Sequence, residues 1–278
     1  MIRVMAQGED EGEVKAAVAE VVAAVERAAA RMTELTPPTR TAGRVLVVGV
    51  SDASGATGIQ AAIKSISALG AFACATVAAV IAEDVEQRIP PVAVAAQMRA
   101  VLADIGTDVL VVGGLSDPAT VEAVADVLDG EARGIPVVLD LAEPTTAELS
   151  RLARIAIAIA AEESSDIDTQ KLAATRLSRP GHAAFVTSAH GDVLADGATL
   201  SVFPPKRGTD RPVRGRGMSL AAAIGAGLAQ GLPLAAAVRR GRDYVDEAIL
   251  TAPEFGRGAS PLNHVHTCRH TPAAAFET

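Results

Sequence analysis

The chain has almost no aromatic residues. It contains no Trp, one Tyr and five Phe, so aromatic residues make up 2% of its 278 residues. Proteins that bind single-stranded nucleic acid combine stacking aromatics with a positively charged groove, whereas the net charge here is −8. The composition therefore argues against nucleic-acid binding.

Cysteines and long apolar runs are scarce as well. Two cysteines, Cys74 and Cys268, make neither a disulfide framework nor a zinc site, so we expect a cytoplasmic protein. Cys74 lies in an apolar run and is expected to be buried rather than reactive. No run of 18 apolar residues is present, which predicts no membrane span, and residues 8–13 are acidic where a signal peptide has its apolar core.

A length of 278 residues suits one large α/β domain or two small ones, and an apolar content of 49% is sufficient for a sizeable core. Residues 14–32 carry Val, Ala and Met at helical spacing and predict an amphipathic helix. We expect residues 1–42 to form this helix and a linker, and residues 43–278 to form the main domain. The helix either packs on the domain surface or serves in dimerisation.

Strand and helix patterns alternate along the main domain. Short β-branched runs predict buried parallel strands at residues 44–50, 109–112, 136–141, 155–159 and 184–187. Helices are predicted at residues 58–69, 92–104, 118–128, 146–152, 169–177, 218–229 and 233–250. This order predicts a mostly parallel central sheet covered on both faces. Asp196-Gly197 predicts an antiparallel hairpin near the end of the sheet.

Two glycine-rich turns carry functional signals, of which the first is weak by itself and the second is the more informative. Residues 52–58 join the first strand to the first helix, where either a ligand site or a plain tight turn is expected. Residues 214–218 read Arg-Gly-Arg-Gly-Met and open an apolar helix, whose free N–H groups and dipole favour an anion. Arg214 and Arg216 either add positive charge for a phosphate or are simply solvated. Met218, just inside the helix, cannot accept a proton.

Six segments, taken in order, carry a resemblance to a known family: residues 54–74, 109–115, 121–124, 137–140, 214–218 and 256–264. This ordered series resembles the hydroxymethylpyrimidine and phosphomethylpyrimidine kinases of thiamine biosynthesis, members of the ribokinase-like superfamily. The resemblance covers about residues 43–266. It implies a three-layer α/β/α ribokinase-like fold, ATP and magnesium, an aminopyrimidine-like small-molecule substrate and a homodimer.

The resemblance also implies site residues, and many of the reactive side chains differ. The anion loop keeps Gly215 and Gly217 around Arg216, but the base of the family aligns with Met218. The family implies substrate-binding positions at Ala62, Glu83 and Gly114. Asp52, in the first glycine turn, is added to them as a candidate substrate-binding residue. The nucleotide-binding positions are Thr187 and His190, and the metal and phosphate motif falls on Ala161 and Ser164.

Three functions remain open from the sequence. They are a pyrimidine kinase with impaired catalysis, a non-catalytic pseudokinase that binds a small ligand or a partner protein, and a kinase of the same fold for another substrate. Asp52 and Asp210 are candidates for a replacement base. The alternative is that each serves as a turn or cap residue, a role in which aspartate is common. We expect absent or very slow ATP turnover, ligand binding near Asp52, Glu83 and Gly114, and no metal site at His264 and His266.

Overall fold

The computed structural model describes residues 12, 15, 16, 18, 19, 22, 43–82, 85–115, 117–141, 152, 155–161, 166–205 and 212–268. It divides into two units, Met1–Thr41 and Ala42–Thr278. The six described residues of the first unit are helical, and all are exposed except the half-buried Val18. The rest of the helix predicted at residues 14–32 lies outside the described residues.

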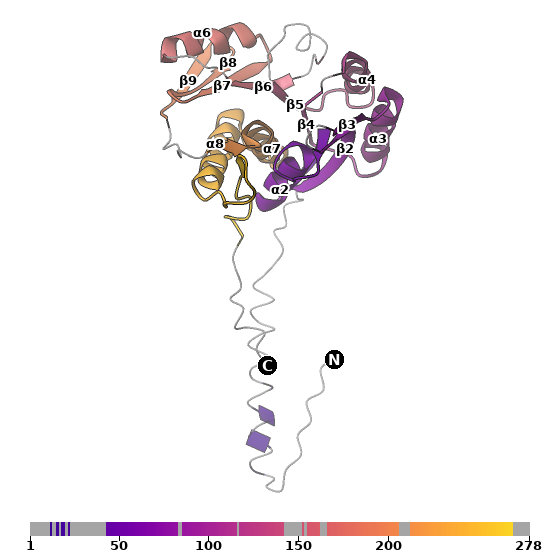
Figure 1. Ribbon diagram of the computed structural model, residues 1–278, viewed down its shortest axis with the longest axis vertical. Coiled ribbons are helices and arrows are strands. Elements are labelled where there is room, and N and C mark those ends of the chain that lie inside the picture. The colour runs from indigo at the N-terminus through magenta and orange to yellow at the C-terminus, as the bar shows by residue number, and fades with distance from the viewer. Residues whose placement is uncertain are drawn as a thin grey trace. The chain divides into compact units, whose positions relative to one another are not determined.

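A twisted sheet forms the centre of the second unit (Figure 1). In the described part of the chain it contains nine strands in the order β3-β2-β1-β4-β5-β6-β7-β8-β9. Strands β2, β1, β4, β5, β6 and β7 run parallel, while β3, β8 and β9 are antiparallel to their neighbours. The bounds are β1 (Arg44–Asp52), β2 (Phe72–Ala82), β3 (Val85–Arg88), β4 (Val109–Gly113), β5 (Val137–Leu141), β6 (Ile155–Ala161), β7 (Ala183–Ser188), β8 (Gly191–Asp196) and β9 (Thr199–Phe203).

All five strands predicted from β-branched runs are present, and Asp196 pairs with Thr199 in the expected antiparallel hairpin. Strands β2 and β3 extend the sheet beyond β1 and were not predicted. The sequence of β2, FACATVAAVIA, is rich in alanine, which is depleted in strands. Its strand conformation comes from its long parallel pairing with β1 rather than from local preference.

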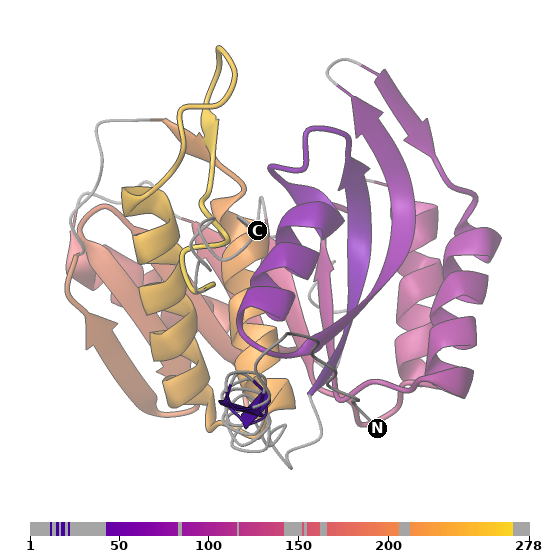
Figure 2. The same ribbon diagram turned by 90° about the horizontal axis from the view of Figure 1, so that it is seen from below.

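Helices cover both faces of the sheet, as Figure 2 shows. One face packs against α2 (Gly58–Ala68), α7 (Arg216–Ala229) and α8 (Leu234–Leu250), and the other against α3 (Pro91–Asp104), α4 (Pro118–Asp129) and α6 (Ile167–Leu177). Successive residues of β1 alternate between these two cores, with Val45 and Val47 on the α7 side and Leu46 and Val48 on the α3 side. The result is the expected three-layer α/β/α domain.

The helices lie close to their predicted ranges where they are described. The helix predicted at residues 146–152 is the exception, since residues 146–151 are outside the described residues and Leu152 is not helical. None of the described helices combines the length and hydropathy needed to cross a membrane.

Helix α7 runs antiparallel to the central strands. The C-terminal end of α7 packs against the residue before β1, because a Cβ on Gly43 would lie 2.5 Å from the carbonyl carbon of Ala229. In its middle, a Cβ on Gly225 would lie 2.6 Å from Val111 Cγ2, so glycine allows close approach to the sheet. The N-terminus of α7 therefore lies at the carboxyl edge of the parallel strands, where ligands bind in open α/β sheets.

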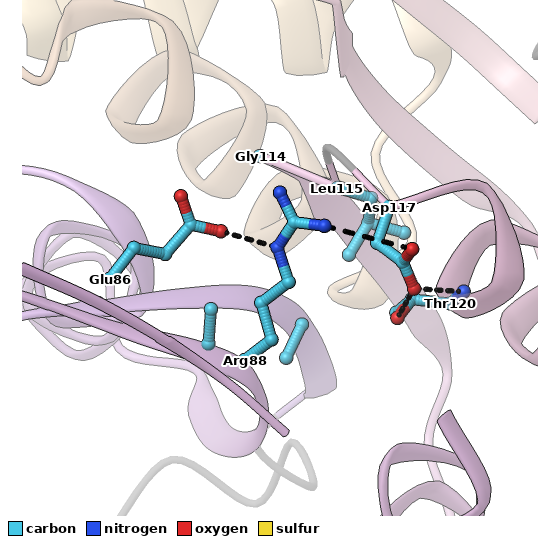
Figure 3. Close-up of a pocket in the computed structure, with 8 residues that line it drawn as sticks. Glu86, Arg88, Gly114, Leu115, Asp117 and Thr120 are labelled. Carbon is cyan, nitrogen blue, oxygen red and sulfur yellow. Dashed lines mark hydrogen bonds and ion pairs between the residues drawn. The ribbon is translucent and has the colours of Figure 1, made fainter. Parts of the chain in front are cut away.

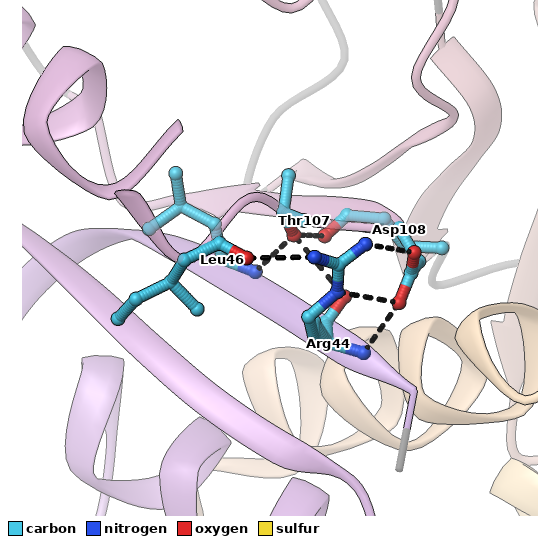
Figure 4. A network of polar contacts seen from close by, with 6 residues as sticks. Arg44, Leu46, Thr107 and Asp108 are labelled. Carbon is cyan, nitrogen blue, oxygen red and sulfur yellow. Dashed lines mark hydrogen bonds and ion pairs between the residues drawn. The ribbon is translucent and has the colours of Figure 1, made fainter. Parts of the chain in front are cut away.

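A polar network fixes the opposite, amino edge of the sheet (Figure 4). The Arg44 guanidinium donates to Asp108 Oδ1 at 2.8 Å, and the Leu46 N–H donates to Thr107 Oγ1 at 3.0 Å. The hydrogen bond from Arg44 lowers the pKa of Asp108. These contacts join the start of β1 to the turn before β4, at the edge of the sheet opposite the carboxyl ends of the parallel strands.

Candidate active site

The two glycine-rich turns pack against each other at the carboxyl edge. Gly215 adopts a left-handed conformation with φ of 90°, and a Cβ there would lie 1.9 Å from the carbonyl oxygen of Ala56. The same Cβ would lie 3.6 Å from Thr57 Cα. Only glycine permits this approach. Two signals that are 160 residues apart in the sequence thus belong to one structural site.

Asp52 organises the first of these turns. Its carboxylate accepts hydrogen bonds from the N–H and hydroxyl of Ser54, at 2.9 and 2.7 Å, and from those of Thr57, at 3.1 and 3.0 Å. Burial by itself would raise the pKa of Asp52, but the hydrogen bonds from Ser54 and Thr57 together lower it. The carboxylate is therefore held ionised, and its oxygens are engaged within the turn.

The second turn opens α7 without a side-chain cap. Gly215 is the N-cap residue, and Ser219 N is the first amide to bond back, to Gly215 O at 3.1 Å. The amides ahead of Ser219 in the first helical turn have no intrahelical acceptor. Arg214 and Arg216 are exposed beside them. This arrangement presents positive charge and free N–H donors to an anion.

Asp140, near the end of β5, lies against this helix end. A Cβ on Gly217 would lie 2.7 and 2.9 Å from the two carboxylate oxygens of Asp140. Burial raises the pKa of Asp140 to about 6. In the described part of the chain no group donates a hydrogen bond to this carboxylate. The sequence pattern around Asp140 indicates only a strand, in which it is the one acid of the apolar run VVLDL.

Met218 packs into the sheet instead of facing an anion. Its side chain is 6% exposed. A Cβ on Gly113 would lie 3.0 Å from Met218 Sδ, and one on Gly49 would lie 3.3 Å from Met218 Cε. The thioether thus fills the space above two strand glycines, beside Asp140. The interior position of the loop supplies an apolar contact and no proton acceptor.

A small, partly open pocket adjoins the end of β4 (Figure 3). Its walls come from the β2–β3 hairpin and the β4–α4 turn, and its lining residues are Ala78, Ala79, Glu86, Arg88, Gly114, Leu115, Asp117 and Thr120. The Arg88 guanidinium lies 2.9 Å from Glu86 and 3.8 Å from Asp117. Asp117 also caps α4 by accepting bonds from the N–H and hydroxyl of Thr120. Gly114, a predicted substrate position, lines this pocket.

The other predicted positions are placed as follows. Ala62 is fully buried on α2. Thr187 is buried near the end of β7, where its hydroxyl donates to Ala160 O at 3.5 Å, and His190 is exposed in the turn that follows. Ala161 ends β6 on the same edge. Glu83, Ser164 and Asp210 lie outside the described residues. The structure therefore gathers Asp52, Gly114 and residues 215–218 at the edge near β1, with Thr187 farther along it.

Magnesium is implied by the resemblance, and the described side chains were considered as its ligands. Among them, no group of three or more His, Cys, Asp or Glu residues is arranged to hold a metal ion. Magnesium bound to phosphates needs few protein ligands, so it would arrive with a nucleotide. His264 contacts Ser65 and Tyr244 through Nδ1, at 3.3 and 3.1 Å, and burial lowers its pKa to about 4.

Comparison with known proteins gives a consistent match. The family model described as phosphomethylpyrimidine kinase matches residues 52–142 and 141–263. The hydroxymethylpyrimidine/phosphomethylpyrimidine kinase of Rhizobium meliloti is 32% identical over 80% of this chain and 96% of its own length. The thiamine biosynthesis bifunctional protein of Geobacter sulfurreducens is 31% identical over 80% of this chain, which spans only 52% of that relative. The ADP complex of Bacillus subtilis pyridoxal kinase aligns with a TM-score of 0.74 and 20% identity, covering 81% of this chain and 98% of its own. That structural likeness shows a ribokinase-like fold.

Proposed function

Because the chain belongs to the phosphomethylpyrimidine kinase family, we propose that it transfers the terminal phosphoryl group of ATP to hydroxymethylpyrimidine or to its phosphate. We further propose that the rate is low. The observation that carries the proposal is the uncapped N-terminus of α7, held by Gly215 against the first glycine-rich turn. Such a helix end supplies donors for the phosphoryl group in transfer.

In this reaction the substrate alcohol attacks the γ-phosphorus while the bond to the ADP oxygen breaks. Catalysis of phosphoryl transfer relies mainly on positioning and on stabilisation of charge. The α7 N-terminus, with Arg214 and Arg216 beside it, supports the second of these roles. Met218 itself cannot act as a base, and general-base catalysis typically contributes about 10²–10⁴-fold. The rate is therefore low unless another group accepts the proton.

The pocket beside Gly114 is proposed to receive the pyrimidine ring. The Glu86 carboxylate can accept hydrogen bonds from an amino group of the ring. Gly114 places no side chain over that space.

A non-catalytic role is the second candidate. Met218 fills the space above Gly49 and Gly113 that a smaller reactive side chain would leave open. A protein that only binds the nucleotide or the pyrimidine would retain the fold and the binding turns but would not need a residue that accepts a proton. A kinase for another small alcohol is the third candidate.

The deciding experiment combines ligand binding with turnover. Full-length protein is tested by thermal shift with ATP, hydroxymethylpyrimidine and pyridoxal, each with and without magnesium, since a ligand that binds the native state raises Tm. ADP release is then measured at high enzyme concentration for the natural chain and for Met218→Cys. The kinase proposal expects stabilisation by ATP with magnesium and by hydroxymethylpyrimidine, slow ADP release, and faster release by the variant.

The other outcomes separate the candidates. Stabilisation without ADP release by either protein supports the non-catalytic role. Turnover of pyridoxal alone supports another substrate. No stabilisation by any ligand, together with no ADP release, contradicts all three.

We also propose a cytoplasmic homodimer. The family resemblance supports the dimer, and the free thiols of Cys74 and Cys268 suit a reducing compartment. Sedimentation equilibrium at micromolar concentration tests the assembly, and a mass of one chain would refute the dimer.

A further inference from the structure

We propose that Asp140 accepts the proton of the substrate alcohol, in place of a residue at position 218; this inference rests on the proposed kinase function. Asp140 follows Leu139 in β5 and pairs with Gly113 of β4, which sets it at the carboxyl edge of the sheet. Nothing in the family resemblance assigned it a role.

The first argument is position. The Asp140 oxygens lie 2.7 and 2.9 Å from the site of a Cβ on Gly217, in the first turn of α7. A phosphoryl group held by the free amides of that turn brings the attacking alcohol next to this carboxylate. Glycine at position 217 is itself explained, because any side chain there would collide with the carboxylate oxygens.

The second argument is availability. The oxygens of Asp52 accept four hydrogen bonds from Ser54 and Thr57. Asp117 caps α4 and lies near Arg88. Of these three described carboxylates near the carboxyl edge, Asp140 alone has neither a hydrogen-bond donor nor a cation at its oxygens. Met218, which like Asp140 lies next to Gly113, cannot compete for the proton.

The third argument is proton affinity. Burial raises the pKa of Asp140 to about 6, and a general base works best when its pKa lies near the working pH. At pH 7.5 the carboxylate is ionised and can take a proton. In the step, the alcohol oxygen forms a bond to the γ-phosphorus, the bond from that phosphorus to ADP breaks, and the alcohol proton moves to a carboxylate oxygen of Asp140. Water later removes this proton and restores the carboxylate.

The same burial has a consequence for stability. The folded-state pKa of Asp140 is raised, so the stability it contributes is fully present below its unfolded value and is lost as pH rises through 6. Asp140→Asn, which stays neutral, should therefore raise Tm at pH 7.5 and leave Tm nearly unchanged at pH 4. A residue that merely supports the fold would lower Tm at both pH values when replaced.

The test measures ADP release from pH 5 to 9 by the full chain with ATP, magnesium and hydroxymethylpyrimidine. The proteins are the natural chain, Asp140→Asn, Met218→Cys and the double variant. Glu131→Gln is the matched control, because it makes the same carboxylate-to-amide change at an exposed ion pair with Arg99. We expect kcat/KM of the natural chain to fall tenfold per pH unit below about pH 6.

Asp140→Asn is expected to lose about 10²–10⁴-fold in kcat/KM together with this acid limb, as removal of a general base does. Met218→Cys should restore part of the rate in the Asp140→Asn background, and Glu131→Gln should match the natural chain.

Three results would overturn the inference. Equal rates and equal pH profiles for the natural chain and Asp140→Asn would show that Asp140 takes no proton. An inactive natural chain with an active Met218→Cys variant would show that the natural chain has no working base, which removes the role of Asp140 and supports the non-catalytic candidate. No ligand-induced stabilisation and no ADP from any variant would refute the kinase proposal, and the inference with it.

Discussion

Gly215 shows how one residue holds the two glycine-rich turns together. Alanine at this position meets two separate costs: the positive φ of 90° and a Cβ only 1.9 Å from Ala56 O. Gly134 also has a positive φ, of 86°, but has nothing within 4 Å of its Cβ position. Gly134→Ala should therefore cost only about 1 kcal/mol for the left-handed backbone.

Gly215→Ala should cost at least about 3 kcal/mol, since it adds a backbone collision to the same conformational strain. Chemical denaturation of both variants measures the difference. Equal losses of stability would mean that the contact between the two turns is not tight in solution.

His264 should make stability depend on pH. Burial, and after it the charges of Lys64 and His266, lowers its pKa to about 4 from 6.5. The unfolded chain therefore binds a proton between these values that the folded chain does not, so stability is full above pH 6.5 and is lost as pH falls towards 4. The loss attributable to this side chain is about 3.5 kcal/mol at most, from about 1.4 kcal/mol for each of the roughly 2.5 pH units between the two pKa values.

Unfolding in urea between pH 7 and 4 checks this. His264→Gln should flatten the dependence, while His190→Gln, at an exposed position, should retain it. Because Asp140 titrates in the opposite sense, each variant is compared with the natural chain at the same pH. An unchanged slope in His264→Gln would rule out the assigned environment.

At the scale of elements, a buried ion pair joins α8 to the antiparallel end of the sheet. Arg242 donates to Asp192 of β8 and to Pro204 O, and its guanidinium lies 5.5 Å from the centroid of the Phe203 ring. The two charged side chains are 8% and 3% exposed. Asp192→Asn should cost about 3–5 kcal/mol, because it leaves a buried charge without its partner.

The double variant Asp192→Leu/Arg242→Met removes both charges and should recover part of that loss. A double-mutant cycle with the single variants, followed by thermal unfolding, gives the coupling free energy. A coupling near zero would show that the two side chains are solvated rather than paired.

Local pattern predicted the elements whose residues agree with their environment. The runs at β1, β4 and β5 are β-branched because both faces are buried, and their strands were found where expected. Strand β2 was not predicted because alanine has a low preference for strands. Its strand conformation depends on pairing with β1, which the local sequence does not show. The N-terminus of α7 was predicted for the same local reason, since its glycines and the apolar run after them lie within one short segment.

The site as a whole depends on pairing across the sheet, and this limits what the sequence reveals. The absence of a base at Met218 follows from its chemistry alone. The closeness of Asp140 to Gly217 requires the order β4-β5 and the path of α7 across that face. No spacing in the sequence encodes this meeting of residues 77 positions apart. Sequence alone therefore points to Asp52 and Asp210, beside residues typical of turns, as candidates for a replacement base, and does not point to Asp140.

At the scale of the whole molecule, the second unit is expected to work without the first. It contains all the described strands, both large apolar cores and the entire match to the family model. A chain starting at Ala42 should therefore keep Tm within about 2 °C, equivalent to less than about 1 kcal/mol for a domain of this size. Its ligand-induced thermal shifts should match those of the full chain.

A second truncation provides the contrast. Ending the chain before Ser260 removes β11 (Ser260–Pro261), which pairs with β10 (Val213–Arg214) next to the anion loop, together with the buried His264. This variant should lose several degrees in Tm, because a structural pair and a buried contact with Tyr244 are lost. Calorimetry of both truncations, with and without ATP, tests the assignment. A large loss of stability or of the ATP-induced shift on removal of residues 1–41 would show that this segment contributes to folding or to the site.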